Sequence, residues 1–68
     1  MTDTKQLREL IKASGLKYGF IANALELTMY GLQKKIDNDS EFKSSEIKKL
    51  CDILKLTIEQ MEQVFFAH

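Results

Sequence analysis

Apolar residues recur along the chain at the three- and four-residue spacing of amphipathic helices. The first stripe consists of Leu7, Leu10 and Ile11. Asp3 or Thr4 can cap this helix, because a short oxygen-bearing side chain accepts a hydrogen bond from the first helical turn. Gly15 suits the left-handed conformation that commonly ends a helix. The pattern predicts a first helix that ends near Gly15.

Two apolar stripes then meet in the stretch FIANALELTMYGLQKKI, residues 20–36, with almost no room for a loop. We expect one helix over about 17–25 and another over about 29–36, with Thr28 as the N-cap of the second. Helices that cross after so short a turn need a small residue where their axes come closest, and Ala22 occupies that place. These features predict a helix-turn-helix unit.

The next part of the chain predicts a polar turn and a fourth helix. Residues 37–40, with the sequence DNDS, form the turn, and Phe42 beyond it is placed to fill the core. Ser44 or Ser45 is the expected cap of the fourth helix. The apolar stripe of that helix consists of Ile47, Leu50, Cys51 and Leu54.

A fifth helix is predicted to begin with a capping box, because Thr57 is followed three residues later by Gln60. Its apolar stripe consists of Ile58, Met61, Val64 and Phe65. Phe65 and Phe66 are adjacent and face different directions on a helix. One should fill the core, and the other is either a loose terminal aromatic or a dimer contact. The candidate dimer contacts are Val64, Phe65 and Phe66.

The whole chain, residues 1–68, is predicted to form one compact all-α domain of five helices. It has no proline and three glycines, which favours helices with tight connections. No apolar run approaches the roughly 20 residues of a membrane span, and no secretory leader opens the chain. Cys51 is the only cysteine, so an intrachain disulfide is excluded. We expect a cytoplasmic protein without membrane contact.

Composition argues against catalysis and leaves charge as the remaining functional signal. There is no His–carboxylate or Cys–His cluster, no glycine-rich phosphate loop and no metal-ligand spacing, so we predict no enzyme, cofactor or metal. Residues 5–35 carry six basic and two acidic residues, whereas residues 36–68 carry four lysines and seven acids. This split is either chance scatter on a helical surface or a basic face for an anionic partner.

A set of residues spread over most of the chain matches one family pattern. They are Ile21-Ala22, Leu25, Leu27-Thr28, Leu32, Lys35-Ile36, Glu41-Phe42 and the segment SEIKKLCDIL at 45–54. In combination they resemble the Cro and repressor helix-turn-helix family of temperate phages, which includes small Cro-like and modulator-of-repression proteins of phages from Gram-positive bacteria. The resemblance implies a lambda-repressor-like DNA-binding fold, with its helix-turn-helix at about 17–37.

The resemblance also implies that the second helix of this unit enters the major groove of operator DNA. Its candidate DNA-binding residues are Thr28, Met29, Tyr30, Gln33 and Lys34. In such a site Gln can bond adenine in a bidentate manner, Lys can reach guanine, and Met or Tyr can pack on a thymine methyl group. The candidate phosphate contacts are Lys17, Tyr18, Lys35 and Lys43.

The sequence departs from the family pattern at three places. Tyr18 stands at the start of the second helix, where a glutamine is common. Glu26 stands where a glycine is common, so it must adopt a left-handed conformation at a cost of about 1 kcal/mol or sit in an altered turn. Asp37, Asp39 and Glu41 follow the DNA-reading helix, where acidic side chains would repel a phosphate backbone.

Two functions are therefore expected from this sequence. The first is a sequence-specific, Cro-like repressor of a phage lytic–lysogenic switch, which binds operator DNA as a homodimer in the cytosol of the bacterial host. The alternative is an antirepressor that binds the DNA-binding domain of a cognate phage repressor through the same helix face. Met29 and Tyr30 would anchor that complex, because Tyr and Met are enriched in protein–protein contacts.

Overall fold

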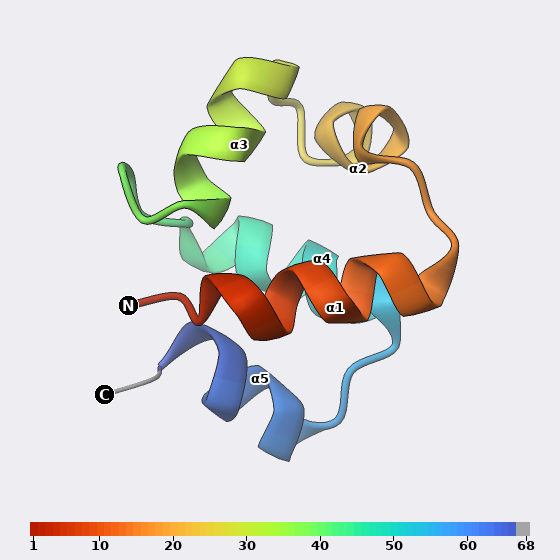
Figure 1. Cartoon of the computed structure of the whole chain (residues 1–68), viewed down its shortest axis with the longest axis vertical. Helices are drawn as coiled ribbons and strands as arrows, with labels where there is room; N and C mark the ends of the chain where they lie inside the picture. The colour runs from red at the N-terminus through yellow and green to blue at the C-terminus, as the bar shows by residue number, and fades with distance from the viewer. Residues whose placement is uncertain (67–68) are drawn as a thin grey trace.

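The computed structural model describes residues 1–66, which form five helices and no strand. The helices are α1 (Thr4–Ser14), α2 (Tyr18–Ala24), α3 (Met29–Ile36), α4 (Ser44–Leu54) and α5 (Ile58–Phe65). In Figure 1, α1 crosses the middle of the molecule, with α2 and α3 on one side, α5 on the other and α4 behind it. None of the helices in residues 1–66 is long and apolar enough to span a membrane. The predicted all-α architecture is confirmed.

Several helix ends lie where the sequence pattern predicts, because the capping side chains form the expected hydrogen bonds. The Asp3 carboxylate accepts from the Gln6 N–H at 3.0 Å, and Gly15 ends α1 with a φ of 76°. Thr57 and Gln60 form the reciprocal capping box of α5, with N···O distances of 2.9 and 3.1 Å. Local cap chemistry therefore sets both ends of α1 and the start of α5.

The start of α4 differs from the prediction. Ser44 is the first helical residue and Lys43 is the N-cap, so neither Ser44 nor Ser45 caps the helix. Instead, the Glu46 carboxylate reaches back and accepts from the Lys43 N–H at 2.8 Å. A carboxylate in the first turn is also favourable near the positive end of the helix dipole. These two contributions stabilise a helix that starts one or two residues earlier than predicted.

α2 and α3 form the expected pair of helices joined by a tight turn. Ala22 is buried at 3% exposure, and its carbonyl accepts from the Leu27 N–H at 2.8 Å. Glu26 has a φ of 58°, the left-handed conformation that glycine adopts most easily. The turn is therefore not altered at this position, and Glu26 carries the expected backbone strain of about 1 kcal/mol. Thr28 caps α3 and accepts from the Gly31 N–H at 2.9 Å.

The core takes apolar side chains from all five helices. Its buried members are Leu7, Ile11, Ile21, Ala22, Leu25, Leu32, Ile36, Leu50, Val64 and Phe65. Phe42 packs against this core as predicted, with its ring edge-on to Phe65 at a centroid distance of 5.6 Å. Ile58 is 70% exposed, so its predicted inward position is wrong. It is the first residue of α5, at the opposite end of the helix from the buried Val64 and Phe65.

The first residues of the chain tie α3 to α5. The Asp3 N–H donates to the Val64 carbonyl at 2.6 Å. Thr2 exchanges two hydrogen bonds with the Asn38 side chain, which accepts from the Thr2 N–H at 2.8 Å and donates to the Thr2 carbonyl at 2.7 Å. These bonds hold the end of α3 against the N-terminal segment.

Replacing Ala22 with leucine should overpack the contact between α2 and α3 and lower the free energy of unfolding by about 1–3 kcal/mol. Chemical denaturation followed by circular dichroism measures this change. Ala13→Leu is a matched control, because Ala13 is exposed on α1. An Ala22→Leu protein as stable as the wild type would contradict the close packing of the two helices.

Candidate nucleic-acid interface

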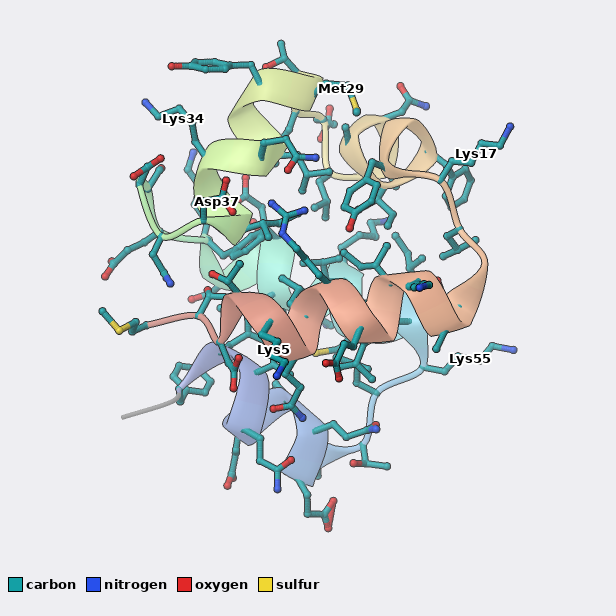
Figure 2. All side chains as sticks on the ribbon, in the orientation of Figure 1. Lys5, Lys17, Met29, Lys34, Asp37 and Lys55 are labelled. Atoms are coloured by element: carbon teal, nitrogen blue, oxygen red, sulfur yellow. The ribbon has the colours of Figure 1, made fainter. Side chains whose placement is uncertain are left out.

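The N-terminal turn of α3 carries three of the predicted DNA-binding residues. Thr28, Met29 and Tyr30 are all exposed, the last two at 49% and 74%. Figure 2 shows Met29 at the outer end of α3, beside α2. The inner side of α3 is held by Leu32 and Ile36, which are fully buried. The helix is therefore fixed along one face and open to a partner along the other.

Lys34 lies one turn further along α3, next to Tyr30. Its ammonium group is 5.5 Å from the centroid of the Tyr30 ring, a cation–π contact worth about 0.5–1 kcal/mol at an exposed site. Figure 2 shows Lys34 pointing away from the helical body. The structure thus brings two of the predicted DNA-binding side chains into contact with each other.

The start of α2 contributes Lys17 and Tyr18, two of the predicted phosphate contacts. Lys17 is the exposed N-cap of the helix and points outward in Figure 2. Tyr18 is half-buried, and its hydroxyl accepts a hydrogen bond from Arg8 Nη1 at 3.5 Å. The hydroxyl hydrogen remains able to donate to an anion. Both residues therefore stay in the candidate interface.

Arg8 of α1 links the elements of this interface, although it is not one of the site residues predicted from the sequence. Its Nη2 atom donates to Gln33 Oε1 at 3.0 Å and to Asp37 Oδ1 at 2.8 Å. The hydrogen bond with Asp37 is the main cause of a raised Arg8 pKa. Gln33 is thus engaged within the protein, and the Asp37 carboxylate is partly neutralised. No local pattern could have shown these contacts, because Arg8 is 25 and 29 positions away from its partners.

Lys35 is not an exposed phosphate contact, and this prediction is corrected. The residue is 9% exposed, and its Nζ atom lies 2.5 Å from Glu46 Oε1 of α4. Burial alone would raise the pKa of Glu46, but hydrogen bonds from Lys35 and from the Lys43 N–H outweigh it and lower that pKa. Lys35 is buried because it lies on the inner side of α3, three residues after Leu32.

The surface around α2 and α3 is close to neutral, although the first half of the chain is basic. Apart from the members of the Arg8–Asp37 and Lys35–Glu46 pairs, the charged residues of segment 17–43 are Lys17, Lys34, Lys43, Glu26, Asp39 and Glu41. Lys43 is exposed at the N-cap of α4, after a loop that carries two of these acids. Figure 2 places Lys5 on the α5 side of α1, away from α2 and α3. The basic residues of 5–35 therefore do not gather on one surface.

Large apolar side chains accompany these charges on α2 and α3. Phe20 is 55% exposed on α2, and Met29 and Tyr30 are exposed on α3. Phe20 is not one of the residues predicted from the sequence. Its exposure could have been predicted from the helical periodicity, because the next two residues, Ile21 and Ala22, turn inward. Exposed bulky apolar side chains on two helices that pack together, α2 and α3, are typical of surfaces that contact a partner.

The predicted dimer contacts divide into core and surface. Val64 and Phe65 are buried at 0% and 4% exposure, so their predicted role in a dimer is corrected to one in the core. Phe66 is 53% exposed. It lines a pocket of about 330 Å³ together with Met1 and Ile47, among others. Of the three candidates, Phe66 alone is accessible to a partner.

Replacing Lys35 with methionine should leave the Glu46 carboxylate buried without its partner and lower the free energy of unfolding by roughly 3 kcal/mol at neutral pH. The folded-state pKa of Glu46 is lowered, so the stabilisation is present above its ordinary pKa of 4.5 and is lost as the pH falls below it. Denaturation measured from neutral pH to about pH 3 should therefore show a weaker pH dependence in the variant.

Lys48→Met is a matched control, because Lys48 is exposed on α4. Identical pH dependence in the wild type and in Lys35→Met would contradict a stabilising pair between α3 and α4.

Comparisons with models of protein families, with characterised proteins and with solved structures gave no match to this chain. The Cro-type resemblance therefore rests on residues of the sequence, and the function that it implies is a proposal. The geometric support is the exposed first turn of α3, which stands on a buried inner face.

Proposed function

We propose that the chain is a sequence-specific DNA-binding regulator of transcription, a Cro-like repressor in a phage lytic–lysogenic switch that acts in the cytosol of the bacterial host. The observation that carries the proposal is the exposed N-terminal turn of α3, packed against an α2 in which Ala22 is buried. A helix that presents its first turn in this way fits the major groove of DNA, which is about 12 Å wide.

The open face of α3 supplies the chemistry for base contacts. Lys34 can donate to the acceptors of guanine, and Met29 and Tyr30 can pack on thymine methyl groups. The Thr28 hydroxyl already accepts from the Gly31 N–H, and its hydrogen can donate to a phosphate or a base edge. These roles use the exposed atoms of each side chain and require no change in the fold.

Phosphate contacts are proposed for Lys17, Tyr18 and Lys43, and they position the protein without reading sequence. The nearly neutral surface makes this electrostatic contribution small. A second copy would double the number of contacts, so we infer binding as a homodimer to two half-sites. Phe66, exposed beside its pocket, is the proposed contact between the copies.

The second candidate is an antirepressor, which would bind the DNA-binding domain of a cognate phage repressor through the same face. The observation that favours it is the exposure of Phe20, Met29 and Tyr30 at 55%, 49% and 74%. Buried aromatic and apolar anchors dominate protein–protein contacts. A neutral surface is also less favourable for DNA than a basic one.

Selection of binding sites from random DNA duplexes tests the first candidate. Lys34→Ala should weaken binding to the selected site by roughly 1–3 kcal/mol and binding to random DNA much less. With Lys17 and Lys43 each neutralising one phosphate, the logarithm of affinity should fall with that of salt at a slope of about −2 per protomer. Lys5→Ala is the matched control, because Lys5 is exposed on α1 away from α2 and α3.

Equal affinity for the selected site in the Lys34→Ala and Lys5→Ala proteins would contradict base reading by α3. The absence of any preferred duplex at low salt would contradict DNA recognition as a whole.

Phe20→Ser separates the two candidates. Phe20 is on α2 and is not one of the proposed base or phosphate contacts, so the variant should bind the selected duplex within about twofold of the wild type. An antirepressor would instead lose most of its affinity for its cognate repressor, because a truncated aromatic anchor commonly costs about 2 kcal/mol or more. Calorimetric titration of wild type and variant with duplex and with repressor distinguishes these outcomes.

A further inference from the structure

Arg8 determines which way the side-chain amide of Gln33 points. The Arg8 Nη2 atom lies 3.0 Å from Gln33 Oε1. A guanidinium group has five N–H donors and no acceptor. The amide oxygen of Gln33 must therefore face Arg8, because the amide nitrogen could not bond to it. The NH₂ group is consequently turned away from Arg8.

Arg8 is itself held in place by two further elements of the interface. It forms an ion pair with Asp37 after α3, at 2.8 Å. Its Nη1 atom donates to the Tyr18 hydroxyl of α2 at 3.5 Å, and its guanidinium carbon lies 6.0 Å from the centroid of the Tyr18 ring. The contacts with Asp37 and Tyr18 restrict the position of the guanidinium group. Gln33 therefore bonds to a group that is held in place and that can only donate hydrogen bonds.

This orientation limits what Gln33 can read on a base. Bidentate recognition of adenine requires the amide oxygen and nitrogen to face the base together, because the oxygen accepts from N6 and the nitrogen donates to N7. The oxygen of Gln33 is directed to Arg8. The remaining NH₂ group is a donor. Guanine offers it two adjacent acceptors, O6 and N7, whereas adenine offers N7 beside the N6 amino donor, which is left without an acceptor from Gln33.

We propose that Arg8 is a positioning residue that makes Gln33 select guanine over adenine at one position of the binding site. This inference rests on the proposed DNA binding and deepens it. It also replaces the adenine contact expected from the sequence for a glutamine at this place. The selectivity resides in the pair, because Gln33 without Arg8 can rotate its amide to present both atoms.

The test needs a variant that removes the hydrogen bond without changing the local charge. Arg8→Met/Asp37→Asn replaces a cation and an anion with two neutral side chains, so the net charge is unchanged. Asp37→Asn alone is the matched control, because it retains the bond between Arg8 and Gln33. Thermal unfolding of each variant verifies that it is folded before binding is measured.

The orientation is measured first in the protein without DNA. Nuclear magnetic resonance relaxation of the Gln33 side-chain NH₂ group should show restricted motion in the wild type and in Asp37→Asn. In the double variant it should show a mobile amide. The Gln6 amide, which donates to Gln63 Oε1, should be unchanged in all three. Equal mobility of the Gln33 amide in wild type and double variant would overturn the positioning role of Arg8.

Base selection is then measured by enrichment from random duplexes. At the position where Gln33→Ala abolishes the preference, the wild type should disfavour adenine at least about fivefold relative to guanine, and the double variant less than about twofold. Adenine preference in the wild type, or an unchanged preference in the double variant, would overturn this inference alone. Failure to enrich any duplex would overturn the proposed function and this inference with it.

Discussion

The close packing of α2 against α3 is the constraint on which the rest of the structure depends. α2 and α3 pack against each other with Ala22 of α2 buried, and the turn between them closes because Glu26 accepts a left-handed backbone. Once Leu32 and Ile36 are buried, the phase of α3 leaves Met29, Tyr30 and Lys34 on its outer side. The candidate interface is thus a consequence of packing, since the same helix presents opposite faces to the core and to a partner.

Two ion pairs then decide how much charge this interface offers. The Lys35–Glu46 pair removes a lysine from the surface and joins α3 to α4, while the Arg8–Asp37 pair neutralises one of the acids that follow α3. The result is a surface of balanced charge with large apolar side chains. Recognition by such a surface depends on shape and on individual side-chain contacts more than on attraction to a phosphate backbone.

Local signals were sufficient to predict most of the fold, whereas long-range contacts were not. The bounds of α3, the burial of Ala22 and the capping box at Thr57 follow from neighbouring residues in the sequence. The burial of Lys35 could also have been read from helical phase, since it lies on the same side of α3 as Leu32. The contacts of Arg8 with Gln33 and of Thr2 with Asn38 join segments 25 and 36 positions apart, and no periodicity encodes them.

Nuclear magnetic resonance titration of the isotopically labelled protein with its selected DNA duplex tests DNA recognition through α3 most directly. Binding in the major groove predicts the largest amide shift changes in residues 28–34 and at the start of α2, with contacts between the Met29 and Tyr30 side chains and base protons. Backbone amides of α5, which ends at Phe65, should change little. Recognition of DNA through α3 would be contradicted if the α3 amides did not shift, or if the shift changes were the same for any duplex.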